Sequence, residues 1–469
     1  MRCAVLLTLL GAVACAPFTG AEAPPASSAP SAAPQGKQGQ GIGDPDFPAD
    51  GNAGYDVTRY HLKIGYDPVV KHLDGLATIQ AKATQPLSRF NLDLSGFKVG
   101  KVTVDGARAT FERAGSELTV TPAGGLRAGR AFTVAVAYKG TPKPMSDPAN
   151  LGTYGFIPTA DGAFVTGQPN GAKTWFPAND HPADKARFDF ELTVPQGLTA
   201  LANGEQTRQP VTRGGKTTFA WSEKHPMATY LATMTLGKFE LREGRTATGI
   251  PNLAAVDPKF ASALSGLHTV SGEATDYLAT VFGPYPFSST GGVIDDYAAG
   301  YALENQTKPM YGGFRPEDAI IAHEVAHQWF GNSLSIKRWK DLWLNEGFAT
   351  YAEWLWSEHK GKSSAQRVFD THYARTAGDP MWAYPPGRAR PDDLFNESVY
   401  TRGGMALHAL RKSVGDTVFF KIVKEWTARH KYGHVTTPQF IALAERLSGK
   451  QLDQLFDTWL FEPRKPVLS

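Results

Sequence analysis

The sequence predicts an α+β protein of more than one domain, in which an antiparallel β domain precedes a mainly helical domain. Three observations lead to this prediction. The chain has 469 residues, which is enough for two or three domains. Short runs of alternating apolar and polar residues fill residues 49–243. From residue 244 to residue 469, apolar residues recur mainly at helical intervals.

Residues 1–23 have the pattern of an export signal. Met1-Arg2 is a short positive start, and the apolar run 4–14 is too short to span a bilayer as a mature helix. Cleavage after Ala14 is one alternative, lipoprotein processing at Cys15 is the second, and cleavage at Ala21-Glu22-Ala23 is the third. Residues 24–48 are rich in Pro, Ala, Ser and Gly, which predicts a flexible linker. We therefore expect an exported protein, either secreted or lipid-anchored at the cell surface through Cys15.

The β domain is predicted over residues 49–243. In the run 187–194, every second residue is apolar, so one face of the strand meets a core and the other meets solvent. Similar runs are separated by Gly, Pro and Asp, which favour turns. This pattern is typical of antiparallel sheets with one buried face.

The second half, 244–469, is predicted to be mainly helical. Apolar spacing indicates a helix over 261–281, which Gly283-Pro284 would end. A further helix is expected to begin near Pro316 and to stop at Gly331-Asn332. The other predicted helices are 340–358, 403–414, 418–430, 438–448 and 452–460.

The two helices predicted near the middle of this half carry a possible metal centre. His323 and His327 are four residues apart, so both imidazoles lie on one face of a helix and can reach one ion. Glu346, on the next helix, can supply a third ligand. Three protein ligands leave one position open for water, as in catalytic zinc sites. Glu324 lies between the histidines and can take a proton from that water.

A plain amphipathic helix with surface His and Glu is the alternative reading of this pattern. The surroundings of Glu346 argue against it, because the helix that carries it is rich in aromatic residues and is expected to be buried. A buried carboxylate needs a cation or hydrogen-bond donors. Glu353, seven residues after Glu346 and on the same face, either orients a ligand histidine or is a surface acid.

Four motifs in order resemble those of the gluzincin aminopeptidases, the family of aminopeptidase N and the leukotriene hydrolases. The resemblance covers most of the chain from about Tyr55 onward. It rests on the zinc helices and on three further segments: Gln168-Pro169-Asn170-Gly171-Ala172-Lys173-Thr174-Trp175-Phe176-Pro177, Tyr301-Ala302-Leu303-Glu304-Asn305 and Val399-Tyr400-Thr401-Arg402-Gly403-Gly404. Tyr301 stands where the family has Gly in its exopeptidase motif, and Arg402 replaces the usual Lys.

The resemblance implies a thermolysin-like catalytic domain that binds one Zn²⁺ through His323, His327 and Glu346. It implies Glu324 as general base and Tyr400 as the donor that stabilises the oxyanion. Glu304 would bind the free α-amine of a peptide substrate, and Gln168, from the β domain, would reach the same amine or a neighbouring carbonyl. The expected activity is that of an aminopeptidase acting on peptides with a free N-terminus. A thermolysin-like endopeptidase and an inactive peptide-binding protein are the alternatives.

The net charge excludes one class of partner. It is only +3 at pH 7, so there is no electrostatic reason to expect binding to nucleic acid.

Overall fold

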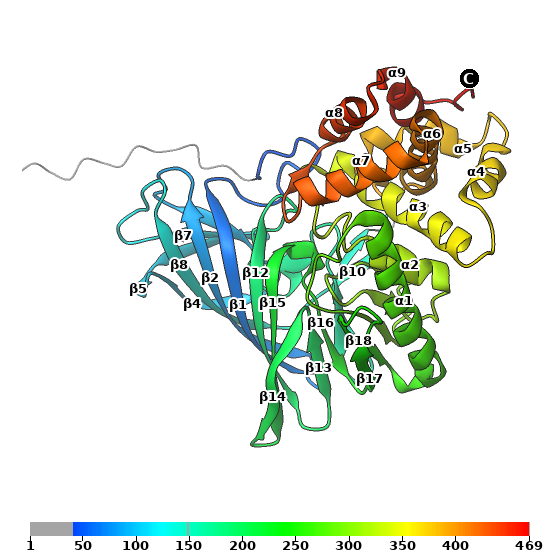
Figure 1. Cartoon of the computed structure of the whole chain (residues 1–469). Coiled ribbons are helices and arrows are strands. Elements are labelled where there is room, and N and C mark those ends of the chain that lie inside the picture. The colour runs from blue at the N-terminus through cyan, green and yellow to red at the C-terminus, as the bar shows by residue number, and fades with distance from the viewer. Residues whose placement is uncertain (1–40, 148–149, 469) are drawn as a thin grey trace, which may run out of the picture.

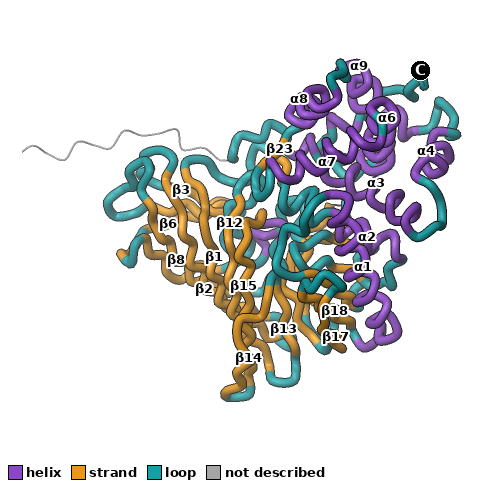
Figure 2. Tube along the Cα trace, viewed as in Figure 1, coloured by secondary structure: helices purple, strands orange, loops and turns teal. Residues whose placement is uncertain are grey.

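The computed structural model describes residues 41–147 and 150–468, in which a strand-rich half precedes a largely helical half (Figure 1). The predicted signal segment, Cys15 and residues 24–40 of the predicted linker lie outside the described residues. Figure 2 separates the two halves by colour, with strands on one side and helices on the other. The predicted α+β class is therefore confirmed.

The N-terminal half contains three sheets. Eight strands form the largest, in the order β14-β15-β12-β1-β2-β8-β4-β5; a five-stranded sheet has the order β13-β16-β11-β10-β9, and a three-stranded sheet the order β3-β7-β6. The strands are β1 (Tyr55–Asp67), β2 (His72–Ala83), β3 (Phe90–Asp93), β4 (Lys98–Val104), β5 (Ala107–Arg108), β6 (Thr110–Ala114), β7 (Glu117–Thr121), β8 (Ala131–Gly140), β9 (Met145–Asp147), β10 (Gly152–Pro158), β11 (Ala163–Thr166), β12 (Lys185–Pro195), β13 (Thr199–Ala202), β14 (Glu205–Arg213), β15 (Lys216–Ala228) and β16 (Met234–Gly237).

The largest sheet is antiparallel except where β1 meets β12. These two strands run parallel, with Tyr60 opposite Phe188, and the two rings stack with centroids 4.7 Å apart. The direction of this pair depends on a long connection between the strands, which alternation within each strand cannot reveal. On the same buried face, Tyr66 of β1 contacts Phe156 of β10 at 5.0 Å. The core thus lies between the eight-stranded and five-stranded sheets.

The C-terminal half combines a small sheet with the helices. The sheet has the order β17-β18-β19-β21-β20, and its strands are β17 (Glu240–Arg245), β18 (Pro251–Val256), β19 (Thr290–Asp295), β20 (Ala302–Leu303) and β21 (Met310–Gly312); β22 (Ser335–Ile336) pairs with β23 (His434–Val435). The helices are α1 (Leu264–Phe282), α2 (Asp318–Ala326), α3 (Trp343–His359), α4 (Ala365–Tyr373), α5 (Pro380–Ala383), α6 (Gly403–Val414), α7 (Asp416–Arg429), α8 (Thr437–Ser448) and α9 (Asp453–Phe456).

Most of the predicted helices are present, with shifted ends. The helix predicted over 403–414 coincides with α6. Helix α2 begins at Asp318 and ends at Ala326, before the predicted stop at Gly331. The intervening residues turn back through hydrogen bonds such as that from the Trp329 N–H to the Ala326 carbonyl (3.0 Å). Helix α4 has no counterpart among the predicted helices.

Within residues 41–48 of the predicted linker, Asp44 is packed against the rest of the molecule, while Gly43, Pro45 and Pro48 are exposed, so the prediction of a flexible segment is corrected at Asp44. Asp44 is only 2% exposed. Its Oδ2 accepts the Trp339 N–H at 3.0 Å and lies 3.3 Å from Nε2 of His181. A composition rich in small and polar residues predicts flexibility, but here a polar side chain finds partners in both halves of the molecule.

The predicted domain boundary between residues 243 and 244 falls inside β17. This strand pairs along its whole length with β18, from Glu240 opposite Val256 to Arg245 opposite Pro251. Strand β17 thus belongs to the sheet of the C-terminal half.

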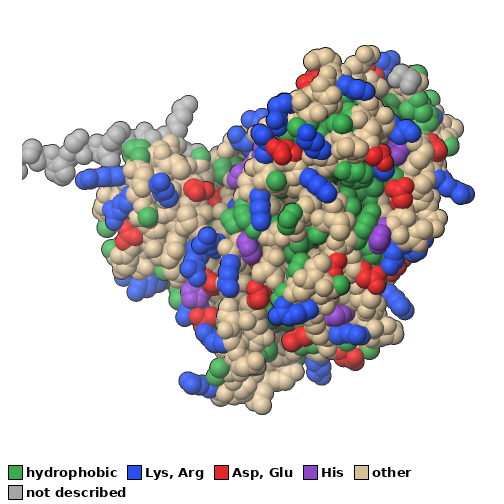
Figure 3. Space-filling view, in the orientation of Figure 1, with side chains coloured by type: hydrophobic (Ala, Val, Ile, Leu, Met, Phe, Trp, Pro, Cys, Tyr) green, Lys and Arg blue, Asp and Glu red, His purple; other side chains and the backbone are tan. Residues whose placement is uncertain are grey.

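Among the described residues, no helix combines the length and the apolar character needed to cross a membrane. On the face shown in Figure 3, basic and acidic side chains are interspersed. This distribution agrees with the small net charge.

Candidate metal centre and active site

Helices α2 and α3 bring the three predicted metal ligands together. Nε2 of His323 and Nε2 of His327 lie 3.4 and 3.2 Å from the same oxygen, Oε2 of Glu346. One ligand atom from each residue falls within 4.8 Å of the others. Phe330, in the turn after α2, packs on Phe348 of α3, and the two rings stack with centroids 4.1 Å apart. The arrangement has the size and the N,N,O donor set of a site for one zinc ion.

The other ring nitrogens of the two histidines are held by outer partners. Nδ1 of His323 lies 2.6 Å from Oε1 of Glu353, and Nδ1 of His327 lies 2.9 Å from the Phe330 carbonyl oxygen. Both contacts leave Nε2 directed at the metal position. The expected contact between Glu353 and a ligand histidine is therefore present.

The charges of this cluster are those of a site built for a cation. Burial alone would raise the pKa of Glu346, but His327 and His323 outweigh it and lower the pKa to about 2. Burial alone would lower the pKa of His327, but Glu346 and Glu304 raise it to about 9. Because zinc needs neutral imidazoles, its binding must displace protons from this cluster.

Glu324 points into the same space and is 5% exposed. Its Oε2 has no hydrogen-bond partner among the described residues. Burial raises the pKa of Glu324 to about 7, although both histidines pull it down. A carboxylate with free acceptor capacity beside the metal position can accept a proton from water.

Glu304 and Gln168 meet in the same cavity, which has a volume of about 280 Å³. Glu304 is buried just after the edge strand β20, and its Oε1 accepts hydrogen bonds from Gln168 Nε2 at 3.3 Å and from the Tyr230 hydroxyl at 3.2 Å. Burial raises the pKa of Glu304 above its usual value. Tyr230 was not among the predicted site residues, because no motif or spacing in its surroundings distinguishes it.

Tyr400 lines the same cavity as Glu304. It lies in a short π-helical turn, Ser398–Arg402, and its ring stacks over His323 with centroids 6.2 Å apart. Burial, reinforced by Glu346 and Glu304, raises the pKa of Tyr400 well above the usual range. The phenol therefore stays protonated and can donate a hydrogen bond.

Arg402, which stands where Lys is usual, is fully buried behind Tyr400. Its guanidinium donates to the carbonyl oxygens of Trp382 (2.8 Å), Thr458 (3.0 Å) and Glu462 (2.6 Å). These hydrogen bonds tie two separate segments, α5 and the C-terminal turn 457–462, to the turn that carries Tyr400.

Tyr301, at the position where the family motif has Gly, forms part of the cavity wall. Its hydroxyl donates to the Thr153 carbonyl at 2.7 Å and lies 2.8 Å from Oγ1 of Thr166. The side chain thus spans from the loop before β20 to strands β10 and β11 of the β domain.

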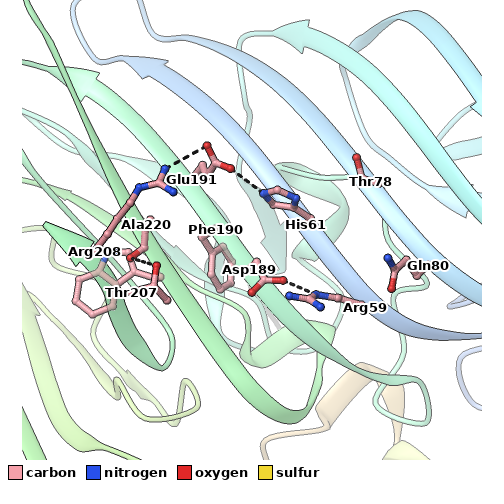
Figure 4. A pocket seen from close by; sticks show the side chains of 11 residues that line it. Arg59, His61, Thr78, Gln80, Asp189, Phe190, Glu191, Thr207, Arg208 and Ala220 are labelled. Atoms are coloured by element: carbon pink, nitrogen blue, oxygen red, sulfur yellow. Dashed lines mark hydrogen bonds and ion pairs between the residues drawn. The ribbon is translucent and has the colours of Figure 1, made fainter. Parts of the chain in front are cut away.

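A second hollow, on the outer face of the eight-stranded sheet, is larger at about 320 Å³ (Figure 4). Its charged groups neutralise each other: Arg59 pairs with Asp189, while Glu191 lies between His61 and Arg208. These side chains are between 22% and 53% exposed. The charged side chains that line this hollow are already paired with one another. Unlike the metal cavity, it therefore offers no set of side chains to a metal ion.

Comparison with known proteins agrees with this geometry. Residues 56–231 match the peptidase M1 N-terminal domain, and residues 314–459 match the peptidase family M1 domain. The structure superposes on an M1 zinc metallopeptidase from Deinococcus radiodurans with a TM-score of 0.83 and 30% sequence identity, covering 92% of this chain and all of that one. The chain belongs to the M1 family of zinc metallopeptidases.

Curated M1 relatives are longer than this chain. Aminopeptidase M1 of Arabidopsis thaliana is 30% identical over 64% of this chain and 37% of its own length. Aminopeptidase N of Lactococcus lactis is 30% identical over 64% of this chain and 38% of its own length. The chain matches little more than a third of the length of these two relatives. A mutant of the Deinococcus enzyme, with a TM-score of 0.82 and 30% identity, is bound to a Tyr-Ser-Ala substrate.

Proposed function

We propose that this protein is a zinc-dependent aminopeptidase that removes the first residue of peptides with a free N-terminus. The observation that carries the proposal is the position of Glu304. Its carboxylate is buried in the cavity of the metal triad, and ligand atoms of Glu304, Glu324 and His327 lie within 4.8 Å of one another. A buried negative charge so close to the reaction centre would bind an ammonium group next to the scissile bond.

His323, His327 and Glu346 would hold the zinc ion, one per chain. When bound, zinc supplies Lewis acidity, which makes a water more acidic and polarises the carbonyl of the scissile peptide bond. The outer contacts of both histidines support this assignment, because they leave the two Nε2 atoms free to bind the metal.

Glu324 would act as general base and then as general acid. Its carboxylate would accept a proton from the attacking water and deliver it to the nitrogen of the leaving amine. Its position among the ligands and its unpaired Oε2 support this role.

Tyr400 would stabilise the negative charge that develops on the carbonyl oxygen. A phenol with a raised pKa remains a donor throughout the working pH range. Its position in the cavity that also holds Glu304, with its ring over His323, supports this role.

Glu304 would bind the α-amine, and Gln168 would contact the amine or a neighbouring carbonyl. Pairing in a buried cavity would orient the first peptide bond over the metal position. The names of the M1 relatives, which are aminopeptidases, support this reaction class. The tripeptide bound by the Deinococcus mutant supports short peptides as substrates.

The two alternatives lack this support. A thermolysin-like endopeptidase needs the metal and a base but no amine anchor, so it leaves the burial of Glu304 unexplained. An inactive peptide-binding protein leaves unexplained why three ligands, a base and a phenol all line one cavity.

The test is hydrolysis of an aminoacyl fluorogenic amide with and without N-acetylation. The free amine should be strongly preferred, and Glu304→Ala should remove most of this preference, since loss of one partner of a buried charge pair costs about 2–5 kcal/mol. A wild-type enzyme that cleaves both substrates equally well would instead be an endopeptidase. If neither substrate is cleaved by zinc-loaded protein, the binding-protein alternative takes its place.

We also propose that the protein is exported, with a mature chain that starts at or after Cys15. The short apolar run and the small residues before Cys15 support this. Mass spectrometry of the mature N-terminus distinguishes the two forms: a diacylglyceryl group on Cys15 indicates a lipid anchor, and a start near Pro24 indicates release. Native protein that retains Met1 would contradict export.

A further inference from the structure

The segment after Glu304 is hydrogen-bonded to the side chain of Gln328, the residue that follows His327. Oε1 of Gln328 accepts the Thr307 N–H at 2.8 Å. Its Nε2 donates to the carbonyl oxygen of Glu304 and to that of Glu324, both at 3.3 Å. A single buried amide therefore contacts the main chain of both the amine-binding residue and the base.

A second side-chain amide also donates a hydrogen bond to the carbonyl oxygen of Glu304. Nδ2 of Asn332, in the turn after α2, donates to the carbonyl oxygen of Glu304 at 2.8 Å. Asn332 is fully buried, and its own carbonyl accepts Nζ of Lys185 from β12 at 2.8 Å. The Glu304 carbonyl thus receives two donors from the segment that follows the zinc-binding helix.

The backbone of this segment needs such support. Thr307 has φ of 64°, in the left-handed region that is unfavourable for a β-branched residue. On its other side the segment binds the β domain: Asn203 Nδ2 donates to the Gln306 carbonyl at 2.8 Å, and the Gly204 N–H donates to Oγ1 of Thr307 at 2.7 Å. Because the segment 304–307 is hydrogen-bonded on both sides, we expect its backbone to keep one conformation.

We propose that Gln328 and Asn332 are positioning residues that set the distance between the amine-binding carboxylate and the metal centre, and thereby the number of residues removed in each cleavage. The inference rests on the proposed function of Glu304 as the amine anchor. Neither side chain needs to touch the substrate. Both act through the main chain of Glu304, which they join to the helix that bears His323, Glu324 and His327.

The distance between the ammonium site and the metal position determines which peptide bond is cleaved. An exopeptidase cleaves after the first residue only if the ammonium site and the metal are one residue apart and stay so. Misplacement of a reacting group by about 1 Å can cost roughly 10²-fold in rate. If the anchor moves, amine binding weakens and the second peptide bond can reach the metal. Blocked substrates, which do not use the anchor, are unaffected by such movement.

The test compares Asn332→Leu with Asn252→Leu. Asn252 is also buried in the C-terminal half, and its Nδ2 also donates to a backbone carbonyl at 2.8 Å, that of His268, away from the site. Leu is close to Asn in size and carries neither charge nor donor. Zinc content, kcat and KM for free and N-acetylated aminoacyl amides, and the products of a peptide ladder are measured for both variants and the wild type.

Asn332→Leu should bind one zinc per chain and lose about 10- to 100-fold in kcat/KM for the free amine, with a raised KM. Its activity on the blocked amide should be unchanged, and dipeptides should appear among the ladder products. Asn252→Leu should keep the wild-type preference and release single residues only. If Asn332→Leu does not fold, Gln328→Met, which removes the other donor to the Glu304 carbonyl, takes its place. Because Gln328 also donates to the Glu324 carbonyl, the expected result is a larger loss on the free amine than on the blocked amide, with dipeptides among the ladder products.

Equal loss on free and blocked substrates, or single residues as the only ladder products, would overturn the positioning role. Failure of the proposed function has a different signature: the wild type itself would not discriminate between the two substrates, and the inference about Gln328 and Asn332 would fall with it.

Discussion

Two hollows of similar size contain histidines beside carboxylates, but only the metal cavity has side chains arranged for catalysis. In the metal cavity, buried Glu346, Glu324 and Glu304 converge, and the described residues that line it include no Lys or Arg. In the hollow on the outer sheet face, Glu191 and Asp189 each lie against basic side chains and are partly open to water. The difference between the two is whether the charges are already neutralised by the protein.

This contrast shows why the larger hollow is not the functional one. Partly exposed ion pairs cost little to form and contribute little to stability. A cluster of buried carboxylates is unfavourable unless a cation enters, so it persists where function requires it. Loss of the groups in the metal cavity should therefore affect activity, and loss of those in the sheet hollow should not.

The largest effect is expected from Glu324→Gln. The amide has a similar shape but cannot accept the proton of the attacking water, so turnover should fall by roughly 10²- to 10⁴-fold or more. Zinc content measured by atomic emission should stay at one ion per chain. Substantial activity in the zinc-loaded variant would mean that another group is the base.

A smaller effect is expected from Glu353→Gln. This change weakens the contact that orients the His323 ring, and loss of such an outer partner typically costs about 10- to 100-fold in metal affinity or activity. Competition with a zinc chelator measures the affinity. If zinc affinity and activity are both unchanged, Glu353 is a surface acid that does not orient His323.

Zinc binding in the metal cavity should depend on pH. The raised pKa of His327, about 9, means that its proton competes with zinc at neutral pH. Affinity should fall as the pH decreases below 9, by about tenfold per unit for each proton displaced. Isothermal titration of zinc into metal-free protein in buffers of different ionisation enthalpy counts the released protons. A pH-independent affinity would contradict the protonated cluster.

The smallest effect is expected from Glu191→Gln in the sheet hollow. Hydrogen bonds from Lys63 and His61 overcome partial burial and lower the pKa of Glu191, but the pairs are exposed to solvent. The free energy of unfolding should change by about 1 kcal/mol or less, and kcat/KM should not change. A loss of activity would show that the outer sheet face takes part in function.

The sequence predicted the metal cavity better than its surroundings. The positions of His323, His327 and Glu353 follow from the helical repeat, which is a local property of the chain. Glu304 and Gln168 could be placed together only through the resemblance to known motifs, since they come from different halves of the molecule.

Tyr230, Gln328 and Asn332 could not be identified in the same way. Their roles depend on which backbone carbonyl or carboxylate lies next to them after folding, and no spacing encodes that. The sequence did not predict the parallel pairing of β1 with β12 or the packing of Asp44 for the same reason. Both depend on partners more than a hundred residues away.

The burial of Arg402 has a consequence for biosynthesis. Its guanidinium bonds to the carbonyls of Thr458 and Glu462, more than fifty residues downstream. During translation, Tyr400 leaves the ribosome well before these partners do. Until they emerge, a cation destined for the interior lacks its acceptors, so the turn that carries Tyr400 cannot reach its final form. The turn that carries Tyr400 can therefore be completed only after residues 458–462 have been synthesised.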